Sequence, residues 1–249
     1  MIYICIPAYN ESTTIGVLLW RIRRVFQDYS REYEIIVYDD ASTDSTLETL
    51  APYVDVIPLT LLKGETRQGY GFALEKLCRE VSRRTRYARR DAAILMQADF
   101  TDQPENIPEL VKRFEGGSDI VAARQEIAAA PAQVRQLRRL AGWIQRSEIP
   151  RTAGADPFNT FRLYRISVLR EVLKSLGEKP LITTTGWAAN MELLVRATRF
   201  ARRIENVELA PRYDLRTRES RVRPLADAFN LLRFTRRAHA LSAPAGGVA

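Results

Sequence analysis

The fold class is decided by the segment Glu34-Ile35-Ile36-Val37-Tyr38-Asp39-Asp40-Ala41-Ser42-Thr43-Asp44. Its first part, 34–38, is rich in Ile and Val and has the length of a buried strand. The acidic and hydroxyl residues after it are typical of a turn that leads into a helix, with Ser42 or Asp44 as the N-cap. The segment therefore predicts a strand over 34–38, a polar loop, and a helix that runs from Asp44 to about Tyr53.

Short apolar runs alternate with longer amphipathic stretches throughout the first half of the chain. The predicted strands cover 2–6, 34–38, 54–59, 93–96 and 119–123, and the predicted helices cover 15–26, 44–53, 68–84 and 104–114. Strands that alternate with helices predict βαβ units and a mostly parallel sheet flanked by helices. The second half is less regular, with predicted strands over 158–164 and 204–209 and predicted helices over 131–147, 187–200 and 225–237.

Composition and charge narrow the class of protein. Hydrophobic residues make up 46% of the chain and charged residues 27%, which is ordinary for a folded, soluble protein. No apolar run approaches the roughly 20 residues that span a bilayer, and the N-terminus lacks the basic start of a signal peptide, so we expect a cytoplasmic protein. The net charge of +8 comes mostly from arginine and fits anionic ligands such as phosphates. The arginines lack interleaved aromatic residues, so we expect no nucleic-acid partner.

Scarce histidine and cysteine exclude several kinds of catalytic site. The chain has one histidine, His239, and two cysteines, Cys5 and Cys78, which lie in apolar patterns and are expected to be buried free thiols. A Ser-His-Asp triad, a histidine-based zinc site and a histidine general base are therefore excluded. Chemistry in this chain must rest on carboxylates, arginines and a hard metal ion.

Acidic residues follow predicted strands where ligands bind in parallel sheets. Asp39 and Asp40 follow the strand over 34–38, and Asp99 follows the strand over 93–96. In such sheets ligands bind beyond the carboxyl ends of the strands. Carboxylates at one edge repel each other unless a metal ion, hydroxyl groups or the N–H of a base compensates them. Each of these aspartates could instead be a turn or helix-cap residue.

Seven motifs in order give the chain a resemblance to a known family. The first four are Pro7-Ala8-Tyr9-Asn10-Glu11, Tyr38-Asp39-Asp40-Ala41-Ser42-Thr43-Asp44, Arg67-Gln68-Gly69-Tyr70-Gly71 and Gln97-Ala98-Asp99-Phe100. They resemble the motifs of family-2 glycosyltransferases with the GT-A fold. The segments 156–162, 192–194 and 216–221 are similar to those of the branch that transfers mannose or glucose to polyprenyl (dolichyl-type) phosphate. The resemblance covers roughly residues 1–225.

The resemblance implies a reaction and an organisation of the chain. A hexose would pass from a nucleotide-sugar, a GDP- or UDP-hexose, to a polyprenyl phosphate, with inversion and with help from Mg²⁺ or Mn²⁺. The fold would be a single GT-A (Rossmann-like) domain over 1–223, with a nucleotide-sugar half over 1–125 and an acceptor half over 126–223. An amphipathic helix over 224–241 and a disordered tail over 242–249 would follow. This helix could pack on the core or contact the cytoplasmic face of a membrane.

The resemblance also assigns roles to residues. The nucleotide would be held by Pro7, Tyr9, Glu11, Asp39, Asp40 and Ala98. The metal ion would be bound by Asp99 with Gln97. The phosphates of acceptor and donor would be contacted by Arg124, Arg138, Arg216 and Arg221. Arg162 and Glu192 lie in matched motifs as secondary candidates. An anionic acceptor phosphate needs positioning more than deprotonation, whereas an alcohol acceptor would need a base such as Asp156 or Glu192.

Three parts of the sequence depart from the family pattern, and one of them is Phe158-Asn159-Thr160, which differs from the usual small-residue run and bears on the acceptor geometry. Gln97 stands where the first Asp of an Asp-x-Asp motif is usual, and Thr101 stands where the branch often has a Gln ligand. A neutral amide oxygen binds Mg²⁺ or Mn²⁺ more weakly than a carboxylate does. Two alternatives therefore stay open: the same donor chemistry with a soluble acceptor, and a nucleotide-sugar-binding protein with a degenerate metal site.

Overall fold

Strand β1 (Ile2–Ala8) is an interior strand of the sheet, and its apolar run is buried on both faces. The computed structural model describes residues 1–125, 155, 159–186 and 188–209. The sheet has the order β3-β2-β1-β4-β6-β5-β7. The other strands are β2 (Tyr33–Asp39), β3 (Leu59–Lys63), β4 (Ala92–Leu95), β5 (Ile120–Gln125), β6 (Arg162–Arg165) and β7 (Ile204–Leu209).

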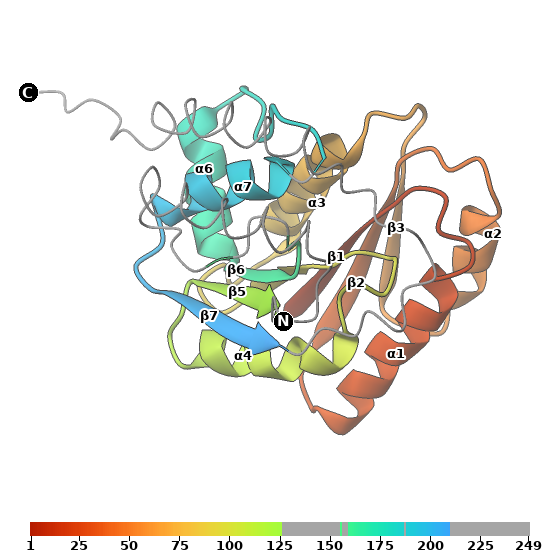
Figure 1. Ribbon diagram of the computed structural model, residues 1–249, viewed down its shortest axis with the longest axis horizontal. Helices are drawn as coiled ribbons and strands as arrows, with labels where there is room; N and C mark the ends of the chain where they lie inside the picture. The colour runs from red at the N-terminus through yellow and green to blue at the C-terminus, as the bar shows by residue number, and fades with distance from the viewer. Residues whose placement is uncertain (126–154, 156–158, 187, 210–249) are drawn as a thin grey trace, which may run out of the picture.

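Helices cover both faces of this sheet (Figure 1). One face packs against α1 (Ile15–Asp28) and α4 (Ile107–Glu115), and the other against α3 (Tyr70–Arg84), α6 (Ile166–Leu176) and α7 (Ala188–Thr198). Shorter elements are α2 (Thr46–Leu50), η1 (Ala51–Tyr53) and η2 (Pro104–Asn106). The predicted α/β class with a mostly parallel sheet is confirmed.

The direction of β6 decides what reaches the ligand-binding edge. β6 runs antiparallel to both of its neighbours, β4 and β5, whereas every other pair in the sheet is parallel. Arg162 at the start of β6 pairs with Leu95 at the end of β4. The residues that lead into β6, Asn159 and Thr160, therefore lie at the carboxyl edge of the parallel strands.

Two predicted elements were wrong or missed. A strand was predicted over 54–59, but the chain turns there and β3 begins only at Leu59, so Val54 and Val56 are exposed. Helix α6 was not predicted. The predicted strand over 158–164 is shorter in the structure, where β6 begins at Arg162. The predicted helices over 131–147 and 225–237 and the domain boundary at 223 lie outside the described residues.

Across the described ranges, no helix is long and apolar enough to cross a bilayer.

Candidate active site

The loops after β1 and β2 are joined by hydrogen bonds between their polar residues. The backbone N–H of Asn10 donates to Ser42 Oγ at 2.9 Å, and the N–H of Thr43 donates to Asn10 Oδ1 at 2.8 Å. The N–H of Glu11 donates to Thr46 Oγ1 at 2.9 Å. The predicted nucleotide-binding loop and the predicted aspartate loop therefore form one connected surface at the carboxyl edge of the sheet.

Asp39 and Asp40 are both buried and both bind backbone N–H groups. Asp39 accepts from the N–H and the hydroxyl of Ser42, at 3.1 and 2.5 Å. Asp40 accepts from the N–H of Gln68 at 2.9 Å and of Gly69 at 2.7 Å. Asp39 thus shapes its own loop, and Asp40 holds the segment that leads into α3.

The loop after β4 carries the candidate metal ligands. The N–H of Gln97 donates to Asp102 Oδ2 at 2.8 Å, and the N–H of Thr101 donates to Asp99 Oδ1 at 3.0 Å. Arg21 on α1 forms an ion pair with Glu105 at 2.6 Å, next to the same loop. Asp99 is half-buried and Ala98 is buried. These contacts fix the path of the loop on both sides of Asp99.

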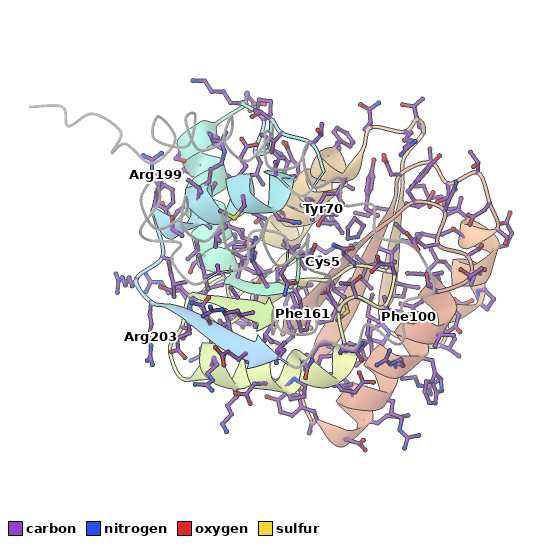
Figure 2. The ribbon with its side chains drawn as sticks, in the orientation of Figure 1. Cys5, Tyr70, Phe100, Phe161, Arg199 and Arg203 are labelled. Atoms are coloured by element: carbon purple, nitrogen blue, oxygen red, sulfur yellow. The ribbon has the colours of Figure 1, made fainter. Side chains whose placement is uncertain are left out.

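Backbone strain is concentrated in these three loops. Non-glycine residues with positive φ are found, within the described ranges, at Asn10 (54°), Ala41 (57°) and Phe100 (62°). Each follows a different one of the neighbouring strands β1, β2 and β4. Such conformations cost about 1–2 kcal/mol per residue and tend to cluster at functional sites. Figure 2 labels Phe100 beside α1, where Arg21 lies over its ring.

Tyr9 stacks with Arg67 at the same edge of the sheet. The guanidinium of Arg67 lies 4.0 Å from the centroid of the Tyr9 ring. Arg67 is exposed and Tyr9 is half-buried. A cation over a flat aromatic ring offers both a stacking face and a positive charge, which suits a nucleoside diphosphate.

Of the four predicted arginines, only Arg124 lies in the part of the chain that the structure describes. Arg124 lies near the end of β5, at the carboxyl edge, with its side chain 41% exposed and 3.9 Å from Glu208. Two strand positions, those of β4 and β6, separate β5 from β1 in the sheet. Arg138, Arg216 and Arg221 lie outside the described residues.

Glu192 has a structural role, because its carboxylate binds neighbouring residues of the protein. Its carboxylate is fully buried and accepts hydrogen bonds from the backbone N–H groups and hydroxyls of Thr183 and Thr184, and from Arg196. Burial alone would raise the pKa of Glu192, but the hydrogen bonds from Arg196 and the Thr183 N–H outweigh it and lower the pKa. These hydrogen bonds stabilise the charged carboxylate, so Glu192 is a poor general base. Arg162 is equally buried and donates to the carbonyl oxygen of Asn190 at 2.8 Å.

A polar ring beside Gln97 was not predicted. We use this name for Tyr70, Thr160 and Asn190, whose side chains are mutually hydrogen-bonded at 2.8 to 3.1 Å. Gln97 Nε2 donates to Thr160 Oγ1 at 2.7 Å. Tyr70 lies at the start of α3 (Figure 2). Tyr70 and Thr160 each lie in a family-like motif, but Asn190 lies in none, and no sequence pattern indicates that the three meet.

The oxygen atoms near Asp99 fit a hard divalent cation. Asp99 supplies a carboxylate, Gln97 an amide oxygen, and Thr101 Oγ1 is buried and makes no hydrogen bond to any described residue. All of these are oxygen ligands of the kind that Mg²⁺ and Mn²⁺ prefer. The described part of the chain has no group of three or more His, Cys, Asp or Glu residues placed to hold a metal. Among the described residues, the protein would therefore supply little negative charge to such a cation beyond Asp99.

Two curated relatives carry names that combine a lipid phosphate with a sugar. Dolichol-phosphate mannosyltransferase of Pyrococcus furiosus is 26% identical over 199 residues, which cover 78% of this chain and 52% of that protein. Dodecaprenyl-phosphate galacturonate synthase of Rhizobium johnstonii is 26% identical over 182 residues, which cover 70% of this chain and 50% of that protein. The chain therefore spans about half the length of these curated relatives.

Solved structures share the fold. Glucosyl-3-phosphoglycerate synthase from Mycobacterium tuberculosis, in complex with phosphoglyceric acid, matches with a TM-score of 0.65 at 20% identity over 100% of this chain and 82% of that chain. The same protein in complex with Mn²⁺, UDP-glucose and phosphoglyceric acid matches with a TM-score of 0.63 at 20% identity over 97% and 78%. This likeness shows the GT-A fold class.

A family model matches more than half of the chain. Residues 3–173 match the model described as glycosyl transferase family 2. That range contains the loops after β1, β2 and β4 and the segment that leads into β6. The chain therefore belongs to glycosyltransferase family 2 and is a glycosyltransferase with the GT-A fold.

Proposed function

We propose that this glycosyltransferase moves a hexosyl group from a GDP- or UDP-hexose to the phosphate of a polyprenyl (dolichyl-type) lipid, with inversion. The observation that carries the proposal is the convergence of three loops on one edge of the sheet: the joined loops after β1 and β2, and the loop after β4 that carries Asp99. The lipid acceptor is supported by the names of the relatives, at 26% identity. Such a reaction would bring the protein to the cytoplasmic face of a membrane as a peripheral protein.

The donor is held by the first two loops in this proposal. Pro7, Tyr9 and Glu11 contact the nucleoside, and Tyr9 stacked with Arg67 provides its flat surface. Asp39 and Asp40 act at the same place, and Asp40 does so by fixing the segment that carries Arg67. Ala98, which is buried between Gln97 and Asp99, lets the β4 loop approach the sugar-diphosphate.

Asp99 and Gln97 would hold a divalent metal ion in this proposal. A bound Mg²⁺ or Mn²⁺ would neutralise the charge that develops on the leaving group. Asp99 supplies the negative charge of this site, and its Oδ1 is oriented by the N–H of Thr101 at 3.0 Å. Gln97 adds a neutral oxygen, so the site depends on the diphosphate for the rest of its affinity.

The acceptor needs no general base. A phosphate oxygen of the lipid attacks the anomeric carbon, and the bond from that carbon to the nucleoside diphosphate breaks with its electron pair on the leaving oxygen. Arg124, at the end of β5, orients the acceptor phosphate together with Arg138, Arg216 and Arg221. This role for arginine agrees with a chain whose single histidine is His239.

The test supplies GDP- and UDP-hexoses with Mn²⁺ and compares polyprenyl phosphate, phosphoglyceric acid and no acceptor. We expect nucleoside diphosphate to be released only with polyprenyl phosphate. Release with phosphoglyceric acid alone would establish a soluble acceptor, and donor binding without release under any condition would favour a binding protein.

The role of Asp99 is tested with Asp99→Asn. Loss of a residue that only hydrogen-bonds to a metal ligand lowers metal affinity or activity about 10- to 100-fold, so loss of the charged ligand itself should lower turnover by at least about 100-fold. Asp55→Asn, at an exposed turn, is the matched control and should keep wild-type turnover. Equal turnover in Asp99→Asn and Asp55→Asn would refute the assigned role.

A further inference from the structure

The carboxamide of Gln97 is held by a closed circle of hydrogen bonds. Thr160 Oγ1 accepts from Gln97 Nε2 at 2.7 Å and from Asn190 Nδ2 at 3.1 Å, and it lies 3.1 Å from the Tyr70 hydroxyl. The Tyr70 hydroxyl donates to Asn190 Oδ1 at 2.8 Å. Both Thr160 and Asn190 are buried.

Proton counting fixes the direction of each hydrogen bond. Thr160 has one hydroxyl proton, and because Tyr70 gives its own proton to Asn190, the proton of Thr160 goes to the Tyr70 oxygen. Asn190 then donates back to Thr160, which closes the circle. Thr160 has no proton left for Gln97, so Gln97 must be the donor, and only an amide nitrogen can donate from this position.

The circle keeps its direction over the whole range of ordinary pH. Burial raises the pKa of the Tyr70 hydroxyl far above its usual value, and the hydrogen bonds with Thr160 and Asn190 oppose this effect only in part. Tyr70 therefore stays protonated and remains a donor. None of the other groups in the ring titrates.

We infer that the polar ring is a positioning device that binds the NH₂ group of Gln97 and thereby presents its Oε1 as a metal ligand beside Asp99. The inference rests on the proposed function, because it takes the metal site from there. Gln97 Oε1 accepts no hydrogen bond from the residues that the structure describes, and the backbone of Gln97 is anchored through Asp102. Thr160, Asn190 and Tyr70 would thus act through Gln97 and not on the substrate.

The ring also accounts for the amide at this position. A carboxylate there could not donate to Thr160, and two acceptors would face each other at 2.7 Å. Turning the Thr160 proton towards a carboxylate would redirect the Tyr70 proton and leave Asn190 Oδ1 buried without a donor, which is unfavourable. The polar ring therefore requires an amide donor, and Gln97 supplies it at the position where the family usually has the first aspartate of its Asp-x-Asp motif.

The test measures Mn²⁺ binding to the full chain saturated with UDP or GDP, by the EPR signal of free Mn²⁺ and against a control of Mn²⁺ and nucleotide without protein. Thr160→Val keeps the shape of Thr160 but removes its hydroxyl, and we expect Mn²⁺ affinity to fall about tenfold or more. Thr160→Ser restores the hydroxyl and should restore the affinity. Thr198→Val removes another buried hydroxyl, bonded to the carbonyl of Val195 on α7, and should leave the affinity unchanged.

Tyr70→Phe provides a second variant in case Thr160→Val does not fold. Without the Tyr70 hydroxyl, the Thr160 proton can turn to Gln97 Oε1, the carboxamide rotates, and its NH₂ group then faces the metal. We expect weaker Mn²⁺ binding here too, with thermal unfolding measured on every variant.

Two results would count against the inference and can be told apart. Wild-type binding with no change in Thr160→Val or Tyr70→Phe would overturn the positioning role and leave the proposed function intact. A wild-type chain that binds no Mn²⁺ would overturn the metal site of the proposed function and the inference with it.

Discussion

Asp40→Asn separates a structural role of this carboxylate from a ligand role. Asp40 is 3% exposed, and its two oxygens accept the N–H groups of Gln68 and Gly69 at 2.9 and 2.7 Å. An asparagine oxygen can accept one of them, but its NH₂ group then faces the other N–H. A hydrogen bond to a charged group contributes about 1.5–3 kcal/mol, so we expect a loss of about 3 kcal/mol in the free energy of unfolding.

The loss can be measured by urea unfolding followed by circular dichroism. A change of about 3 kcal/mol corresponds to a fall of about 6–12 °C in Tm for a chain of this size. Asp55→Asn is the control, because Asp55 lies in an exposed turn. Binding of UDP and GDP should be followed in parallel, by calorimetry at a temperature where both variants are folded.

The reasoning is refuted if Asp40→Asn has the urea midpoint of the wild type. Unchanged stability with lost nucleotide binding would make Asp40 a direct ligand, as the family resemblance implies. Lost stability with nucleotide binding kept would confine Asp40 to holding the segment before α3.

Three further substitutions test other parts of the structure. Glu192→Gln should lower the free energy of unfolding at pH 7 by about 2 kcal/mol, because a neutral amide accepts weaker hydrogen bonds than a carboxylate. The pKa of Glu192 is held below its ordinary value of 4.5, so the wild type loses this advantage as the pH falls below that value. Urea titrations at several pH values should therefore show the difference between the two proteins shrinking. Ala41→Gly relieves the strain of a φ of 57° and should raise the free energy of unfolding by about 0.5–1 kcal/mol, seen as a higher Tm. Ala51→Gly, at a helical position, should lower the Tm. Gly71→Ala would place a Cβ 2.6 Å from the carbonyl oxygen of Thr184 and should cost about 1–3 kcal/mol, measured by thermal unfolding, and no change would show that this segment moves freely.

Elements with a strong local pattern were predictable. The continuous apolar runs gave β1 and β2 within two residues of their bounds, and the i, i+3, i+4 spacing of Ile15, Leu18 and Leu19 marked the buried face of α1. β3 was placed too early because Val54 and Val56 are β-branched, yet they lie in an exposed turn before Pro58. Strand propensity depends on packing that a local pattern does not contain.

The sequence predicted which residues of the candidate site follow strand ends, but not what those residues bind. Strand order places Asp39, Asp40 and Asp99 at one edge, and that edge follows from the alternation of strands and helices. The partners of those residues depend on tertiary contacts. The hydrogen bonds from Gln68 and Gly69 to Asp40 could not be read from the sequence, and neither could the circle around Thr160, whose members are far apart along the chain.

The antiparallel direction of β6 has a consequence for how this enzyme can be altered. β5 ends at the carboxyl edge of the sheet and β6 begins there, with Ala123 bonded to Phe161 at 3.0 Å across the two strands. The chain therefore leaves the sheet after Gln125 and returns to it at Arg162 on the same rim, and a change in the length of such a connection costs little in closure entropy. We expect insertions or deletions between Gln125 and Asn159 to leave the strand order and the donor loops in place, whereas replacement of Thr160 would also remove the partner of Gln97. The length of this connection can therefore be changed without a redesign of the sheet.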